Sequence, residues 1–414
     1  MSDPARVLYR DPIYDGQLAR TLAASAVGAA DLGETLATAR RVGKLSGDSW
    51  YQTWSQTADT AYAAGRWASA AGDRASARHA FLRASEYYRQ ACYFVRARLD
   101  DPRLQGAYGH HVETFRAAIE LMPGTACAVQ IPYEDTTIGG YFFAPAGGQG
   151  PRPTIVFPAG YDSTAEAGWT NVPAALERGY AVLIFEGPGQ GGALYTQRLF
   201  LRPDFEHVMS PVLDWLITRP EVDGDRVILI GRSFGGYLAP RAAAFERRLA
   251  ALVCDPAQPD LGARLPANAL ARLAVPAASL QARLSAGRAE FFGSRMAAHG
   301  VASIGDYFRE LRRFTMMSHA GEITCPTLIV EAENDFAGGS GSKLEAALSC
   351  PATLVTLSAS SGADGHCAGL GQALWNDAVY GWLARTVPAG AFRPQGTEHS
   401  GMLTRSSASA PSTT

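Results

Sequence analysis

Six short apolar segments recur between residues 153 and 357, and stretches with helical spacing separate most of them. The segments are PTIVF (153–157), AVLIF (181–185), RVILI (226–230), ALVC (251–254), PTLIV (326–330) and ATLVTL (352–357). Continuous apolar strands that alternate with helices are typical of a parallel sheet covered on both faces. The pattern therefore predicts an α/β fold with a mostly parallel sheet, whose core occupies residues 129–255 and 321–388.

Other parts of the chain do not follow this rhythm. Residues 1–128 carry Ala, Leu and aromatic residues at three- and four-residue spacing, which predicts an N-terminal helical lid domain. One piece resembles a tetratricopeptide hairpin that turns at Gly72-Asp73, but a single unit is too short for a solenoid, so we interpret it as a helical extension packed on the sheet. Residues 256–320 are expected to form a helical cap insertion. Residues 389–414 are poor in apolar side chains and are expected to be a disordered tail.

Composition excludes several classes of partner. The formal charge of −2 gives no electrostatic reason for binding nucleic acid or an anionic membrane. No secretory signal or bilayer-spanning apolar run is present in the sequence, so we expect a cytoplasmic protein with a small-molecule substrate. The six cysteines form no C-x-x-C pair, which favours reduced thiols and predicts no metal or other cofactor. A homodimer is compatible with these features.

The segment RVILIGRSFGGYLAPRAAA (226–244) places a serine where a strand meets a helix. G-x-S-x-G is a weak signal in a chain with 43 glycines. The strand, the tight turn, the small flanking residues and the immediate helix together predict a nucleophile elbow at Ser233. The amide of Phe234, at the helix N-terminus, is the predicted first donor of an oxyanion hole.

A second oxyanion donor is expected on the loop FPAGYDSTAEAGW (157–169), which follows the first core strand. The order of Pro, small residue, Gly and aromatic residue favours the backbone N–H of Tyr161. Gly160 beside it is a candidate for contact with the substrate. The alternative is that Gly160 only terminates the strand.

An activated serine needs a histidine base and an acid, in the chain order Ser, Asp or Glu, His. The segment CPTLIVEAENDFAGG offers Glu331, Glu333 and Asp335. We prefer Asp335 because it falls on the loop after the strand, and Glu333 is the alternative. Of the eight histidines, His366 alone follows the acid and stands on a loop before an amphipathic helix; the others precede the acid or lie in the tail. The predicted triad is Ser233, Asp335 and His366.

Two further features of the sequence bear on ligand binding. FEGPGQGG matches G-x-G-x-x-G, but its strand is not the first of the sheet and Pro188 stiffens the turn, so no dinucleotide site is predicted. Aromatic residues of the helical region would enclose a pocket, which makes Tyr87 and Tyr88 candidates for substrate binding. The alternative for each is a place in the core.

Several motifs spread over residues 40 to 385 resemble the α/β-hydrolase superfamily. They are GYFFAPAG, PAGYDST, FEGPGQGG, RPEVDGDRVILIGRSFGGYLAPRAAAFERRLAA, CPTLIVEAENDF and GHCAG. More narrowly, they are similar to a branch with an N-terminal helical domain that includes 2,6-dihydroxypseudooxynicotine hydrolase, FrsA-like proteins and fungal polyketide-processing hydrolases. The resemblance implies that the three triad residues act together and that the helical domain and cap close over the substrate.

The resemblance leaves the reaction open, because this branch includes carbon–carbon bond cleavage, ester hydrolysis and polyketide release. It implies a serine hydrolase that acts on a medium-sized aromatic or polyketide-like carbonyl compound. An acyltransferase or cyclase that uses the same acyl-enzyme, or a non-catalytic FrsA-like binding protein, are the alternatives. Carbon–carbon cleavage also needs a group that protonates a carbanion, for which Asp255, Asp260 and Glu290 are candidates.

Overall fold

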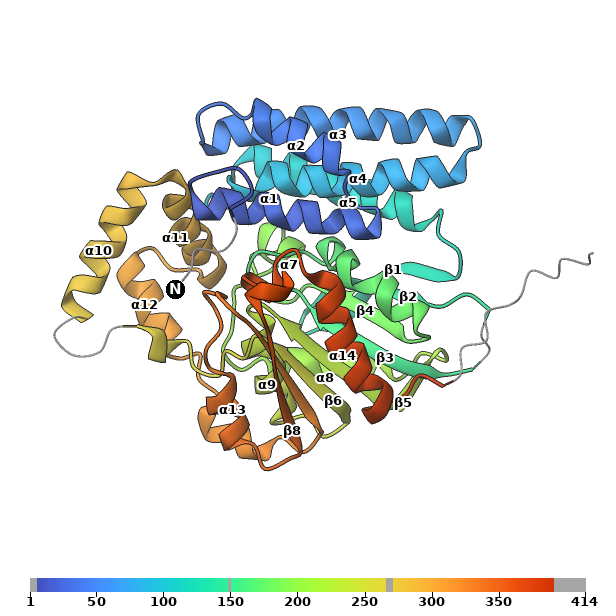
Figure 1. Ribbon diagram of the computed structural model, residues 1–414, viewed down its shortest axis with the longest axis vertical. Helices are drawn as coiled ribbons and strands as arrows, with labels where there is room; N and C mark the ends of the chain where they lie inside the picture. Colours follow the sequence, from blue (N-terminus) through green and yellow to red (C-terminus); the bar gives the residue numbers. More distant parts are fainter. Residues whose placement is uncertain (1–5, 148–149, 266–270, 391–414) are drawn as a thin grey trace, which may run out of the picture.

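The structure is a computed structural model that describes residues 6–147, 150–265 and 271–390. It has an α/β core, a layer of N-terminal helices over one end of the sheet, and a helical cap beside that layer (Figure 1). The helical layer and the cap touch each other, since Ser285 of the cap donates a 2.8 Å hydrogen bond to Asp11 at the start of α1. One end of the sheet is therefore covered by two helical parts that come from distant segments of the chain.

The core is an eight-stranded sheet, within the described residues, with the strand order β1-β2-β4-β3-β5-β6-β7-β8. The strands are β1 Thr125–Tyr133, β2 Thr136–Ala144, β3 Arg152–Pro158, β4 Ala181–Phe185, β5 Val222–Arg232, β6 Leu249–Asp255, β7 Thr327–Ala332 and β8 Ala352–Leu357. β1 and β2 run antiparallel to their neighbours, and the strands from β3 to β8 pair in parallel. The six apolar segments fall on β3 to β8, and the predicted α/β fold is confirmed.

The hairpin of β1 and β2 carries no continuous apolar run. The second half of β1 alternates buried and exposed side chains, as an edge strand with one solvated face does. β1 begins at Thr125, a few residues before the expected start of the core at 129.

The N-terminal layer contains α1 Pro12–Ala24, α2 Leu32–Arg41, α3 Gly47–Ala70, α4 Arg74–Tyr93 and α5 Pro102–Ile119. Each of these helices begins after an Asp or Ser whose side chain accepts a backbone N–H of the first turn, which satisfies donors that a helix N-terminus leaves open. α3 and α4 form a hairpin that turns at Gly72, where φ is 77°. α4 is buried along most of its length, so it is the core of this layer.

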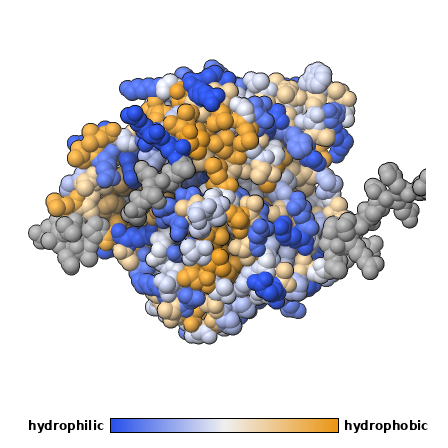
Figure 2. All heavy atoms as spheres, in the orientation of Figure 1, coloured by the Kyte–Doolittle hydropathy of each residue, from blue (hydrophilic) through white to orange (hydrophobic). Residues whose placement is uncertain are grey.

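The cap lies between β6 and β7 and contains α10 Ala271–Leu284, α11 Ala286–His299 and α12 Ile304–Leu311. α11 faces the N-terminal layer, whereas α10 exposes Leu273, Leu280 and Leu284. Figure 2 shows apolar surface over this part of the molecule. Residues 266–270 of the expected cap lie outside the described residues.

The remaining helices flank the sheet. They are α6 Val172–Glu177, α7 Gly191–Tyr195, α8 Glu206–Leu216, α9 Gly235–Ala243, α13 Gly341–Ala347 and α14 Gln372–Thr386. Within the described residues, no helix combines the length and the apolar character that crossing a membrane requires. The expected disordered tail lies outside the described residues from 391 onward.

Candidate active site

Ser233 sits in a sharp turn between the end of β5 and the start of α9. Its φ is 57°, a left-handed conformation that non-glycine residues rarely adopt. The turn is crowded, because a Cβ atom on Gly231 would overlap the carbonyl of Gly235, and one on Gly236 would overlap the carbonyl of Pro256. At Gly235 the nearest such atom is 4.0 Å away. The glycines that this elbow requires are therefore Gly231 and Gly236.

The structure brings Ser233, His366 and Asp335 into one hydrogen-bonded chain. His366 Nε2 lies 2.8 Å from Ser233 Oγ, and His366 Nδ1 lies 2.8 Å from Asp335 Oδ1. The amides of Ala337 and Cys367 also donate to the Asp335 carboxylate, at 2.8 and 3.1 Å. The Asp335 side chain is fully buried, whereas 30% of the His366 side chain is exposed. The base is thus reachable from outside while the acid behind it is shielded.

The alternative acid, Glu333, takes another role. Its carboxylate accepts a 2.6 Å hydrogen bond from the amide of Ala359, and Asp335 is the residue that reaches His366.

The electrostatics of the pair favour an ionised acid beside a basic imidazole. Burial opposes the charge on Asp335, but its hydrogen bond to His366 and the two backbone amides hold the pKa of Asp335 below its usual value. Burial likewise disfavours the imidazolium, yet Cys367 and Asp335 stabilise it, so the pKa of His366 lies well above its usual value. Asp335 can therefore stabilise the charge that His366 acquires when it accepts a proton.

The predicted oxyanion donors lie on two adjoining segments. A Cβ atom on Gly160 would be 3.3 Å from Ser233 Cβ and 3.6 Å from the amide nitrogen of Phe234, so the loop after β3 passes directly beside the elbow. The rings of Tyr161 and Phe234 are in contact, with centroids 4.0 Å apart. In the described part of the chain, neither amide donates to a protein acceptor. Two amides without a protein acceptor beside Ser233 are compatible with the predicted oxyanion hole.

Two arginines that the sequence analysis did not single out hold the loops of the triad. Arg232, just before Ser233, donates to Asp255 Oδ2, to Asn171 Oδ1 and to the carbonyl of Cys367, at 2.9, 2.9 and 2.8 Å. Arg264 donates to the carbonyls of residues 336, 337 and 338, which follow the acid. Their partners are mainly backbone carbonyls far away in the sequence, which leave no motif.

The remaining candidates lie in different places. Tyr87 and Tyr88 are buried in the helical layer, where their hydroxyls bond to Glu34 and Asp59, and the structure does not bring them to Ser233.

Of the candidate carboxylates for carbon–carbon cleavage, Asp255 lies beside the elbow, since its carbonyl accepts the amide of Ser233 at 2.7 Å. Asp260 accepts an amide of its own loop. Glu290 is buried on α11, where burial raises its pKa to about 7.

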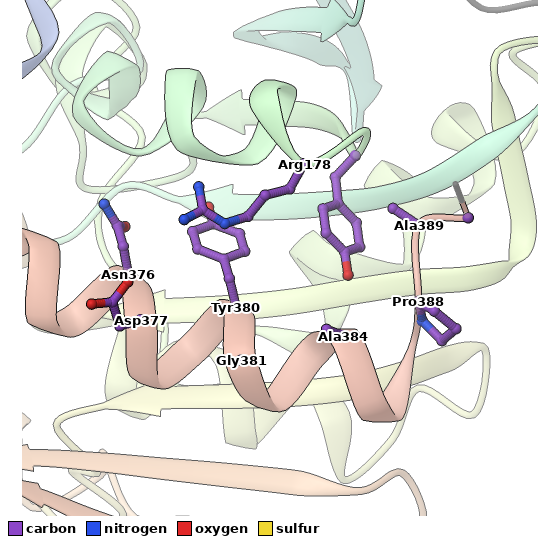
Figure 3. Close-up of a pocket in the computed structure, with 10 residues that line it drawn as sticks. Arg178, Asn376, Asp377, Tyr380, Gly381, Ala384, Pro388 and Ala389 are labelled. Carbon is purple, nitrogen blue, oxygen red and sulfur yellow. The ribbon is translucent and has the colours of Figure 1, made fainter. Parts of the chain in front are cut away.

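A possible metal site and a surface groove are weaker candidates for an active site. The possible metal ligands are Asp335, His366 and Cys367, but hydrogen bonds already occupy both oxygens of Asp335. A surface groove of about 640 Å³ lies between α6 and α14 (Figure 3). The guanidinium of Arg178 covers the ring of Tyr380 there, 4.7 Å from its centroid, and no triad residue lines the groove. The triad remains the candidate active site.

Comparison with known proteins gives consistent matches over most of the chain. A family model described as Esterase FrsA-like matches residues 17–275. Hydrolase acrC of Aspergillus aculeatus is 34% identical over 366 residues, which cover 79% of this chain and 84% of that protein. The 20-hydroxy-prefusarin hydrolase FUS2 of Gibberella moniliformis is 31% identical over 358 residues, which cover 80% of this chain and 84% of that protein.

Among solved structures, 2,6-dihydroxy-pseudo-oxynicotine hydrolase superposes with a TM-score of 0.73 at 22% identity, over 90% of this chain and 96% of that one. The protein AbyA5 superposes with a TM-score of 0.62 at 18% identity, over 86% of this chain and 91% of that one. The two superpositions, each over at least 86% of this chain, show a shared fold.

Proposed function

The chain belongs to the FrsA-like esterase family of hydrolases, and from this premise we propose that it is a serine hydrolase that forms an acyl-enzyme on Ser233. The observation that carries the proposal is the unbroken chain from Ser233 Oγ through His366 to Asp335, with 2.8 Å at each step. A nucleophile, a base and an orienting acid in this order are the requirements of acyl transfer through serine. The position of Ser233 in a strained turn supports the same role.

The reaction follows from the geometry. His366 Nε2 accepts the hydroxyl proton of Ser233 while Oγ attacks the carbonyl carbon of the substrate, and the carbonyl oxygen becomes an oxyanion. The amides of Phe234 and Tyr161 donate hydrogen bonds to that oxygen, and Asp335 stabilises the imidazolium. When the tetrahedral intermediate collapses, the leaving group departs and takes the proton from His366. Water, deprotonated by His366, then releases the acyl group and restores Ser233.

The surroundings of the triad favour a substrate with apolar or aromatic parts. The ring of Phe336 lies 4.5 Å from that of His366, centroid to centroid, and is 70% exposed. Leu370, on the loop that carries His366, is 54% exposed. These side chains offer apolar contact at the reachable side of the base. With relatives such as the 20-hydroxy-prefusarin hydrolase, they support a medium-sized, aromatic or polyketide-like carbonyl substrate.

A second candidate function is acyl transfer or cyclisation, in which a nucleophile of the substrate replaces water in the last step. The hydrogen-bonded triad serves both reactions equally. The possible reactions also differ in the bond that breaks. In ester cleavage the leaving group is an alcohol, whereas carbon–carbon cleavage needs an acid that protonates a carbanion. Of the three candidate carboxylates, Asp255 has a backbone bond to the elbow, but its Oδ2 is engaged by Arg232.

Intact-protein mass spectrometry tests the proposal. The protein is mixed with a panel of aryl ketones, aryl esters and thioesters, and quenched in acid at short times. We expect a mass increase that equals the acyl part of at least one compound, absent in Ser233→Ala. Free acid as the product identifies hydrolysis, and a cyclic or transferred product identifies the alternative. A panel member that is turned over equally by Ser233→Ala would contradict the proposal.

A further inference from the structure

Asp162 follows Tyr161 directly, and its side chain is held by two arginines from different parts of the fold. Arg295 of α11 donates to both carboxylate oxygens, at 3.2 Å to Oδ1 and 2.9 Å to Oδ2. Arg96, just after α4, donates to Oδ1 at 3.0 Å. The two arginine side chains are only 7% and 6% exposed. The Asp162 side chain is 22% exposed, and a carboxylate with two buried guanidinium partners has little freedom to move.

A third arginine holds the main chain at the same point. Arg20 of α1 donates to the carbonyl oxygen of Asp162 at 2.6 Å and to Ser163 Oγ at 3.1 Å. Burial and the nearby Arg89 lower the pKa of Arg20 to about 10, so it is still charged at neutral pH. The side chain and the peptide of Asp162 are thus both fixed. We call Arg20, Arg96 and Arg295 the arginine clamp.

The rest of the loop is fixed from the other side. The hydroxyl of Tyr161 bonds to His299 of α11, and its ring contacts that of Phe234 at the elbow. The side-chain amide of Gln190 donates to the carbonyl of Ala159, before Gly160. With these contacts and the clamp, the segment 159–163 is bonded on both sides of the amide of Tyr161.

The ion pair stays charged at any working pH. Burial opposes the charge on Asp162, but Arg295 and Arg96 outweigh it and hold the pKa of Asp162 far below its usual value. The neighbouring Asp162 raises the pKa of Arg295 despite burial. The clamp is therefore a permanent brace and not a pH switch.

We propose that Arg20, Arg96 and Arg295 are positioning residues that hold Asp162 and thereby aim the amide of Tyr161 at the oxyanion. This inference rests on the proposed function, since it assigns these residues to the oxyanion hole of that site. Arg20 and Arg96 come from the N-terminal layer and Arg295 from the cap. The helical parts thus complete the catalytic geometry, beyond any role in enclosing the substrate.

The size of the effect follows from what an oxyanion donor contributes. Removal of one such donor lowers kcat about 100- to 1000-fold, because the bond forms fully only in the transition state. Displacing a donor, rather than removing it, should cause only part of this fall in kcat. Loss of the clamp should therefore lower kcat and leave KM nearly unchanged.

The test uses Asp162→Asn, which keeps the shape of the side chain and removes its charge, in the full chain with p-nitrophenyl acetate. We expect kcat to fall about 10- to 1000-fold with little change in KM. Phenylboronic acid, whose tetrahedral adduct on Ser233 places an oxygen in the oxyanion hole, should lose affinity by a similar factor. The pH at which activity falls on the acid side should stay that of the wild type, since His366 is untouched.

A second variant guards against misfolding, because Asp162→Asn leaves two buried arginines unpaired. Arg20→Gln removes the bond to the Asp162 carbonyl without breaking that ion pair, and should show the same pattern more weakly, while Arg20→Lys should restore part of the rate. The matched control is Glu206→Gln, which disrupts another ion pair away from the clamp. Arg241 of α9 donates to both carboxylate oxygens of Glu206 on α8, at 2.8 and 2.5 Å. It should lower thermal stability and leave boronate affinity unchanged.

The outcomes separate this inference from the proposed function. If folded Asp162→Asn and Arg20→Gln both keep wild-type kcat and boronate affinity while Ser233→Ala is inactive, the clamp has no positioning role and the serine mechanism stands. A rise in KM at unchanged kcat would also overturn the clamp. If Ser233→Ala retains full activity, the proposed function itself fails.

Discussion

At Ser233 the backbone holds a left-handed conformation that costs on the order of 1–3 kcal/mol for a residue with a side chain. The cost is sustained because β5, α9 and the segment after β6 fix the turn, as the bonds from the amide of Ser233 to the Asp255 carbonyl and from Gln258 to the Ser233 carbonyl show. The hydroxyl is thereby presented to His366 and not to its own backbone.

The first prediction concerns the nucleophile. Ser233→Ala should lower turnover by several orders of magnitude and leave the fold intact, because it removes only the hydroxyl oxygen and keeps the backbone. A fluorophosphonate probe should label the wild type and not the variant. Unchanged turnover together with a wild-type circular dichroism spectrum would remove Ser233 from the mechanism.

The acid gives the second prediction. In the proposed mechanism the neutral form of His366 is the base, and the pKa of His366 is raised, so kcat/KM should fall as the pH decreases through that raised pKa. Asp335→Asn removes a group that stabilises the imidazolium, so it should lower the rate by about 10⁴ and shift this acid limb to lower pH. Glu333→Gln, whose carboxylate bonds to the amide of Ala359, is the control and should change neither. A larger loss of rate in Glu333→Gln than in Asp335→Asn would assign the acid to Glu333 instead of Asp335.

At the scale of elements, the site depends on loops that distant side chains hold together. Arg232 ties the elbow to the carbonyl of Cys367, and Arg264 ties the start of the cap to the loop of the acid. Arg20, Arg96 and Arg295 do the same for the loop after β3. The strands fix where each loop begins, and hydrogen bonds from arginine side chains to carbonyls or carboxylates hold the loops in position.

This division explains what could be predicted from the sequence. Strands β3 to β8 are buried on both faces and read as apolar runs, so the α/β fold was predictable. Chain order singled out His366, and the position of Asp335 on the loop after the strand favoured it over Glu333. The edge hairpin of β1 and β2 has no such run. The arginine contacts could not be predicted, because their partners are backbone carbonyls or carboxylates far away in the sequence, which leave no local pattern.

The elbow provides a third prediction at this scale. A Cβ atom on Gly236 would overlap the carbonyl of Pro256, which belongs to the backbone and cannot move aside cheaply. Gly236→Ala should therefore shift the elbow, lower thermal stability and lower kcat. Gly235→Ala is the matched control, since its nearest neighbour is 4.0 Å away, and its melting temperature should stay near that of the wild type. Equal melting temperatures for the two variants would contradict this account of the turn.

At the scale of the whole molecule, the helical layer and the cap meet above the loop after β3. Gly293 of α11 packs closely on the chain that follows α4, since a Cβ atom there would be 2.7 Å from the Cβ of Ala97. Arg96 and Arg295 are neighbours of this contact in the sequence. A lid that only encloses the substrate would leave small substrates unaffected when this contact opens. If the layer also positions the oxyanion loop, opening this contact should slow the turnover of small substrates as well.

The last prediction uses Gly293→Val as a wedge between the two helical parts in the full chain. We expect lower turnover of bulky esters and, because Arg96 and Arg295 can no longer hold Asp162 together, also of p-nitrophenyl acetate, a substrate too small to need enclosure. Limited proteolysis should cut the chain faster in the segments of the layer and of the cap that form this contact. Gly109→Val, in α5 with no atom within 4 Å of its added Cβ, controls for the cost of valine in a helix and should keep both activities. If the wedge slows bulky esters alone, the helical layer acts as a cover and the oxyanion loop holds its shape without it.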